Sequence, residues 1–172
     1  MTRTGDFSLQ ALYAALDAQR QARGLSWAQA TREINRRPDR SPVHPLSAST
    51  VTRTRTGSVA EGDGVLQMLL WLNRTPESFM PGHHEFDDPA VPLPAVSLQQ
   101  ILRFDTKKLQ VALDAQRAER QMTWRQVAKE VGLGVSSLTY PSRGTRTGFP
   151  HVMRMLKWLG RPAADFTRIC DR

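Results

Sequence analysis

Two stretches of the chain carry the same helical pattern of apolar positions. The pattern has the spacing i, i+3, i+4, i+7, and its members are Val65, Met68, Leu69 and Leu72 in the first stretch and Val152, Met155, Leu156 and Leu159 in the second. This spacing places apolar side chains on one face of a helix, and that face packs into a core. We therefore expect a buried helix near the end of each half of the chain.

The two stretches belong to an internal duplication. Residues 12–35, LYAALDAQRQARGLSWAQATREIN, align without gaps on residues 109–132, LQVALDAQRAERQMTWRQVAKEVG, and 11 of the 24 pairs are identical. From Leu46 onward the equivalent residue follows 87 positions later in place of 97, so the first copy carries ten extra residues, 36–45. Self-similarity of this kind indicates two copies of one structural unit.

The duplication sets the expected domain boundaries. The first copy covers residues 7–80 with its insertion at 36–45, and the second covers 97–172. Between them, residues 81–96 hold four prolines and a group of acids, which disfavour helix and indicate an extended linker. The segment that follows, SLQQILR at 97–103, is expected to form a short helix leading into the second copy.

Polar residues ahead of apolar runs mark where the helices begin. The predicted N-caps are Ser8 and Asp105 for the first helix and Ser26 and Thr123 for the second. A third helix is expected from about residue 47 or 134 to just before Gly57 or Gly144, where glycine suits a left-handed C-cap. With the final helix, each copy becomes a bundle of four to five helices, and the predicted fold class is all-α.

Composition narrows the partner and the compartment. Lysine and arginine exceed aspartate and glutamate by 24 to 16, which favours a polyanionic partner such as nucleic acid, and the second copy holds most of the excess. The single cysteine, Cys170, permits no internal disulfide. No apolar run approaches the roughly 20 residues that span a bilayer, and the first residues lack the apolar core of a signal peptide. We expect a cytoplasmic, nucleoid-associated protein without a membrane partner.

The second copy carries a recognisable motif. TWRQVAKEVGLGVSSLT contains Ala128, Gly132 at a turn and Leu138 in the next helix, with Gly144 twelve residues after the turn and MLKWLGRP closing the last helix. This pattern resembles the Cro/lambda-repressor-like (XRE) helix-turn-helix family. The resemblance implies two tandem bundles of lambda-repressor-like type, each with a third helix that enters the major groove of DNA.

The resemblance also implies which residues meet DNA. In the second copy the base-reading positions would be Val135, Ser136 and Thr139, with Arg143 and Arg146 in the following loop. In the first copy they would be Ala48, Ser49, Thr52, Arg53 and Arg55. These helices lack the Gln or Asn that pairs with adenine, so we expect modest base readout and a large contribution from salt-sensitive phosphate contacts.

The first copy departs from the motif within its turn. The insertion RRPDRSPVHP separates two helices that the family joins tightly, so its recognition helix is expected either at another angle or away from DNA. Arg36, Arg37 and Arg40 in this insertion form either an arm that reaches phosphates or a solvated loop. In the second copy, Pro141 is expected to end the recognition helix early.

Four tryptophans occupy equivalent positions in the two copies. Trp27 and Trp124 lie at the start of the second helix, where packing is favoured over an indole contact to phosphate. Trp71 and Trp158 lie in the final helix, where burial within each copy is favoured over self-association through this helix.

Metal binding and catalysis are not expected. His83, His84, Glu85, Asp87 and Asp88 lie together in the linker but lack the spacing of a metal site. No nucleophile with a base, glycine-rich phosphate loop or pair of carboxylates is recognised, so we expect neither an enzyme nor a cofactor.

The leading functional hypothesis is a repressor-like transcriptional regulator. Its two non-identical copies would bind adjacent half-sites on double-stranded DNA. The alternative is an interaction adaptor or antirepressor that keeps the fold without reading DNA, which the weak base-reading chemistry and the interrupted first motif favour.

Overall fold

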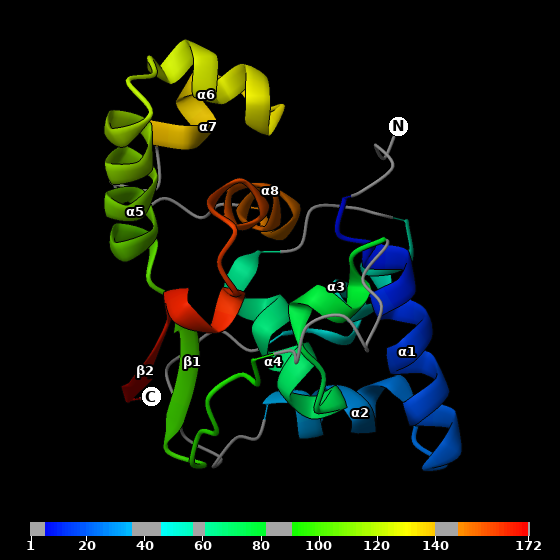
Figure 1. Ribbon diagram of the computed structural model, residues 1–172. Coiled ribbons are helices and arrows are strands. Elements are labelled where there is room, and N and C mark those ends of the chain that lie inside the picture. The colour runs from blue at the N-terminus through cyan, green and yellow to red at the C-terminus, as the bar shows by residue number, and fades with distance from the viewer. Residues whose placement is uncertain (1–5, 36–45, 57–60, 82–90, 140–147, 172) are drawn as a thin grey trace.

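The fold is mostly helical and is described from a computed structural model (Figure 1). The described residues are 6–35, 46–56, 61–81, 91–139 and 148–171. Within these ranges the α-helices are α1 Leu9–Ala22, α2 Trp27–Asn35, α3 Ala48–Arg53, α4 Gly62–Leu72, α5 Thr106–Glu119, α6 Trp124–Val131, α7 Val135–Thr139 and α8 Phe149–Leu159. Short 3₁₀ helices are η1 Thr54–Thr56, η2 Pro76–Phe79 and η4 Ala163–Phe166, and the strands are β1 Gln100–Phe104 and β2 Thr167–Asp171.

The helices begin where local chemistry predicts, and the expected C-caps at Gly57 and Gly144 lie outside the described residues. Ser8 and Asp105 cap α1 and α5 by accepting hydrogen bonds from the backbone of Ala11 and Lys108. Thr123 and Gln126 form a capping box at the start of α6. The predicted helix starts are therefore confirmed.

A short antiparallel sheet corrects the expectation for residues 97–103. Gln100–Phe104 pairs with Thr167–Asp171 as a two-stranded sheet, so most of SLQQILR forms β1 and not a helix. Leu102 is fully buried, and β1 packs along α4 of the first copy. Pairing with a partner strand and burial against α4 outweigh the local preference of this segment.

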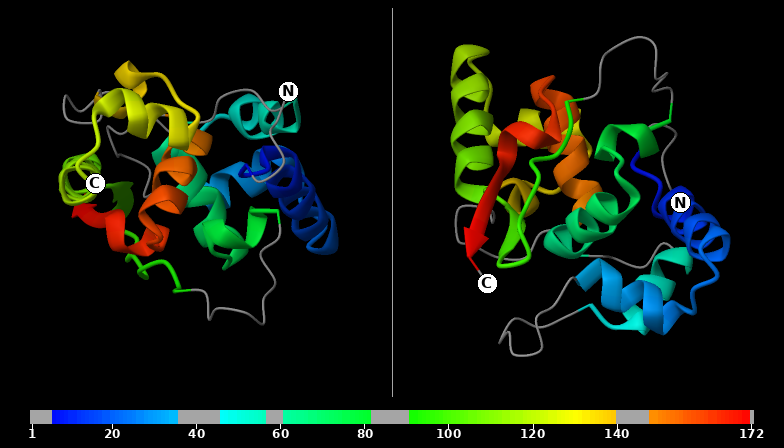
Figure 2. Two further views of the ribbon diagram at one scale, coloured as in Figure 1. Left: turned by 45° about the horizontal axis from the view of Figure 1, so that its top comes forward. Right: turned by 90° about the horizontal axis from the view of Figure 1, so that it is seen from below.

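The two expected apolar stripes lie in the core. All eight of their members, on α4 and α8, have less than a tenth of their surface exposed. Figures 1 and 2 show these two helices at the centre of the molecule, with α1 to α3 on one side and α5 to α7 on the other. The prediction of a buried final helix in each half is confirmed.

The buried residues of both copies form one continuous cluster. The ring of Phe7, at the start of the first copy, lies 4.6 Å from that of Phe149 on α8 of the second copy. The ring of Phe104, just ahead of α5, lies 5.5 Å from the same ring. Leu93 and Val96 of the linker also pack against this cluster. The expected extended linker therefore does not hold the copies apart.

No helix in the described ranges is long and apolar enough to cross a membrane.

Candidate nucleic-acid interface

The second copy contains a tight turn between two short helices. Helix α6 ends at Val131, and Gly132 follows in the left-handed conformation with φ of 72°. The backbone N–H groups of Gly132 and Leu133 both donate to the carbonyl of Ala128, at 2.9 and 3.0 Å. Helix α7 begins at Val135 and packs on α6. Glycine at this position relieves the strain that a side chain would bring to positive φ.

The first copy joins the equivalent helices across its insertion. The side-chain amide of Asn35, the last residue of α2, donates to the carbonyl of Leu46 at 2.9 Å, and its oxygen accepts from the N–H of Leu46 at 2.9 Å. This pair of bonds, which we call the Asn35 clasp, joins the two sides of the insertion. Helix α3 begins two residues later, capped by Ser47, and packs on α2. The insertion therefore leaves the two helices in contact.

A glycine on α4 makes room for Leu46, the residue that follows the insertion. A Cβ placed on Gly64 would lie 2.8 Å from the Cδ2 of Leu46, which is closer than real contacts allow. The absence of a side chain at Gly64 thus lets Leu46 pack against α4. The clasp and this contact fix where α3 begins.

Most of the candidate base-reading residues lie on the first turns of α3 and α7, and Thr52 and Thr139 follow on the next turn. Ser49 and Ser136 are exposed, Ala48 is half-buried, and Val135 is 37% exposed. The hydroxyl of Thr52 donates to the carbonyl of Ser49, and that of Thr139 to the carbonyl of Val135, each at 3.2 Å. Because its proton is used within the helix, Thr52 meets an outside group as an acceptor.

The candidate arginines divide into two groups. Arg53, the last residue of α3, and Arg55 in η1 are exposed. The others lie outside the described residues, and so does the acidic histidine segment of the linker; they are Arg36, Arg37, Arg40, Arg143 and Arg146, with His83, His84, Glu85, Asp87 and Asp88. In the ranges that the structure describes, no group of three or more metal-ligating side chains comes together.

Three further cations were missed by sequence reasoning. Arg32 on α2 and Arg125 and Lys129 on α6 are exposed on the helices that precede the candidate recognition helices. Arg32 and Lys129 occupy equivalent positions of the repeat. A search for retained charge, in place of retained identity, would have found this pair.

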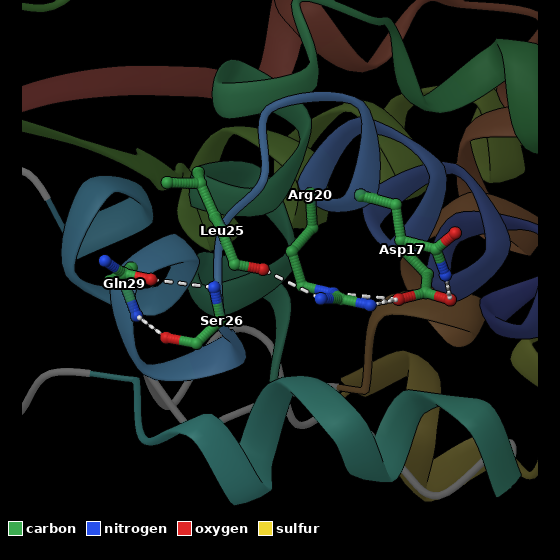
Figure 3. Close-up of polar contacts among 6 residues, drawn as sticks. Asp17, Arg20, Leu25, Ser26 and Gln29 are labelled. Carbon is green, nitrogen blue, oxygen red and sulfur yellow. Dashed lines mark hydrogen bonds and ion pairs between the residues drawn. The ribbon is translucent and has the colours of Figure 1, made fainter.

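The LDAQR string builds the support behind each turn. Arg20 bonds Asp17 at 2.6 Å and the carbonyl of Leu25 at 2.7 Å, which holds the loop into α2, while Ser26 and Gln29 cap that helix reciprocally (Figure 3). Arg117 repeats the arrangement with Asp114 and the carbonyl of Met122. The repeated string is therefore a scaffold.

The same string also reaches the final helix of each copy. The side chain of Gln19 donates to the carbonyl of Trp71 at 2.8 Å, and Gln116 donates to that of Trp158 at 2.9 Å. Each bond joins the first helix of a copy to its last helix. In each copy, the glutamine of LDAQR thus holds the final helix, and the arginine next to it holds the loop that leads into the second helix.

The tryptophans of the final helices lie against their own copies. The indole N–H of Trp71 donates to Glu33 at 3.0 Å, and that of Trp158 donates to Glu130 at 2.8 Å. An arginine completes each group, with Arg120 bonded to Glu130 at 2.8 Å. The hydrogen bond from Trp158, followed by that from Arg120, lowers the pKa of Glu130. Self-association through these tryptophans stays a prediction.

Trp27 and Trp124 have the packing role that sequence reasoning favoured. Both are half-buried against the core. The guanidinium of Arg20 lies 5.0 Å from the ring centre of Trp27, and that of Arg117 lies 5.2 Å from that of Trp124. Tyr13 stacks on Trp27 at 5.4 Å. These contacts place each indole beside the scaffold arginine of its copy.

Comparison of the chain with models of protein families, with curated proteins and with solved structures found no match.

Proposed function

We propose that this chain is a sequence-specific regulator that binds double-stranded DNA through two non-identical helix-turn-helix units of lambda-repressor-like type. The observation that carries the proposal is the repeated pair of packed helices, α2 with α3 and α6 with α7, each ending in a short helix with an exposed serine on its first turn. Helices of this kind present their first turn to base edges in the major groove.

The exposed chemistry suits DNA in two ways. Hydroxyls at Ser49 and Ser136 donate to or accept from any base, and the small apolar groups of Ala48 and Val135 fit a thymine methyl. The cations of α2 and α6, with Arg53 and Arg55, suit phosphate oxygens. We therefore propose a binding surface with strong backbone attraction and weaker base discrimination.

The contact between α2 and α3 in the first copy favours this function over an adaptor. An adaptor gains nothing from a recognition helix held in place across a ten-residue insertion. The Asn35 clasp keeps α3 packed on α2 despite the insertion, so both copies are proposed to contact DNA.

Selection from a random duplex pool tests the proposal. The full-length chain is incubated with the pool at low salt, and bound duplexes are recovered through successive rounds and then titrated in a salt series. We expect an enriched motif whose affinity falls steeply with salt, because phosphate contacts release counterions. Absence of binding at low salt would refute the proposal, and salt-sensitive binding without an enriched motif would refute its sequence specificity.

A further inference from the structure

The two copies contact each other through exchanged N-terminal segments. Asp6, just ahead of α1, is 8% exposed and forms an ion pair with Arg154 on α8 of the second copy, with a shortest distance of 2.5 Å. The repeat equivalent of Asp6 is Arg103, which forms an ion pair with Asp63 on α4 of the first copy at 3.3 Å. Each copy thus lays the segment before its first helix on the last helix of the other.

Further bonds strengthen this exchange. Asp63 also accepts a hydrogen bond from the backbone N–H of Phe104 at 3.1 Å, and Gln67 donates to the carbonyl of Leu102 at 3.0 Å. On the opposite side, Phe7, the repeat equivalent of Phe104, packs its ring on Phe149 of α8. Apolar and charged contacts therefore hold both crossings.

The two crossings are arranged about an approximate twofold axis, although different positions of α4 and α8 carry the ion pairs. Glu61 and Gly148 precede α4 and α8 at equivalent positions of the repeat, and they pair with each other as an antiparallel bridge. A residue meets its own equivalent only where a twofold axis passes between the two. If the two copies were instead arranged head to tail, related by a translation, non-equivalent residues would meet at their contact.

We infer that the chain folds as an internal pseudo-dimer whose DNA target is a pair of half-sites in inverted orientation at one fixed spacing. The inference rests on the proposed function. A DNA duplex has its own twofold axes. Two recognition helices related by a twofold axis therefore bind inverted half-sites, whereas two helices related by a translation bind direct repeats. The two half-sites should match where equivalent residues read them, Ser49 and Ser136 or Thr52 and Thr139. They should differ at the base that Ala48 reads in the first copy and Val135 reads in the second.

One side chain connects the exchange to a turn. Besides its ion pair with Asp6, Arg154 donates to the carbonyl of Gly132 at 3.0 Å, at the turn before α7. The start of the first copy thereby holds the turn of the second. Arg154 is a positioning residue that fixes the direction of α7 relative to the other copy.

Designed duplexes test the orientation. The motif enriched by the full-length chain is divided into half-sites, which are rebuilt as inverted, everted and direct pairs with spacers that grow by single base pairs. We expect tight binding to one inverted arrangement. A change of about five base pairs, half a helical turn, should weaken binding by roughly 100-fold or more, because only one copy can then bind.

The results separate the inference from the function on which it rests. Equal binding to direct repeats, or affinity independent of spacing, would overturn the pseudo-dimer inference while leaving DNA binding intact. Failure to enrich any duplex at low salt would instead overturn the proposed function.

Variants of the exchange test its role in fixing the spacing. Asp6→Asn with Arg154→Gln places at 154 the residue found at its equivalent, Gln67. We expect the preference for the best spacer over the half-turn spacer to fall by about tenfold or more, with binding to the isolated half-site of the first copy unchanged. The matched control is Arg161→Gln with Asp165→Asn, which removes an ion pair of 2.8 Å within the second copy.

An unchanged spacer preference in the folded variant would show that this ion pair does not orient the copies. If circular dichroism shows that the double variant is unfolded, Asp6→Asn alone is used. A reduced spacer preference then supports the role of the ion pair, and an unchanged preference contradicts it.

Discussion

The Asn35 clasp makes a quantitative prediction about the insertion. Asn35→Ala removes both hydrogen bonds to the backbone of Leu46, a residue that is half-buried. Each such bond contributes about 0.5–1.5 kcal/mol net, so the pair stabilises the fold by roughly 1–3 kcal/mol. Alanine favours helix over asparagine by at most about 0.7 kcal/mol, which offsets part of the loss. We expect the free energy of unfolding to fall by roughly 0.3–3 kcal/mol.

Urea denaturation followed by circular dichroism measures the change. In thermal unfolding, at about 2–4 °C per kcal/mol for a chain of this length, the midpoint should fall by roughly 1–12 °C. Gln99→Ala, at an exposed turn, is the control and should leave stability unchanged. The slope of free energy against urea should also stay constant, because the variant does not alter the surface exposed on unfolding.

A second variant separates the two bonds. Asn35→Asp retains an acceptor for the Leu46 N–H but brings a carboxylate against the Leu46 carbonyl, so it should lose at least as much stability as the alanine variant at neutral pH. A loss below about 0.3 kcal/mol in both variants would refute the reasoning that the clasp closes the turn. Wild-type stability in the aspartate variant alone would show that only the bond to the N–H matters.

Three further predictions concern other parts of the molecule. Trp71→Phe should destabilise the chain more than Trp158→Phe in urea denaturation, since the indole of Trp71 is buried and that of Trp158 is half-buried; equal losses would contradict this. Burial, and secondarily a nearby arginine, lower the pKa of His151 below 6.5, so the unfolded chain binds more protons and stability falls as pH drops through and below 6.5. His151→Gln should reduce the difference in urea midpoint between about pH 7.5 and about pH 5.5, and an unchanged difference would assign it to other groups. Arg125→Gln and Lys129→Gln should each reduce the slope of log affinity against log salt by about 1, whereas Arg168→Gln on β2 should not; equal slopes in all variants would move the phosphate contacts elsewhere.

Local chemistry made much of the fold predictable. The caps at Ser8, Asp105 and Thr123 are confirmed because a hydroxyl or carboxylate ahead of a helix satisfies its first N–H groups wherever that helix packs. The apolar stripes of α4 and α8 were equally readable, since their spacing admits one buried face. Short-range rules sufficed for these elements.

The remaining features depend on partners far along the chain. Residues 100–104 form a strand because they pair with residues 167–171 and lie on α4, and neither partner is visible in the local pattern. The Asn35 clasp joins residues on opposite sides of an insertion, so the sequence suggested an interrupted motif. At the candidate site, the positions on α3 and α7 followed from the family resemblance, whereas Arg125 was overlooked because its repeat equivalent is Ala28.

The exchanged N-terminal segments affect how the chain can be divided. If the two copies were produced as separate polypeptides, each would expose apolar surface that the intact molecule covers, including the ring of Phe149 that Phe7 covers from the other copy. Mixed together, the two fragments would cover those surfaces again, as the subunits of an obligate heterodimer do. Evolution and protein engineering can therefore alter the short helices α3 and α7 independently, but not the whole copy that carries each of them.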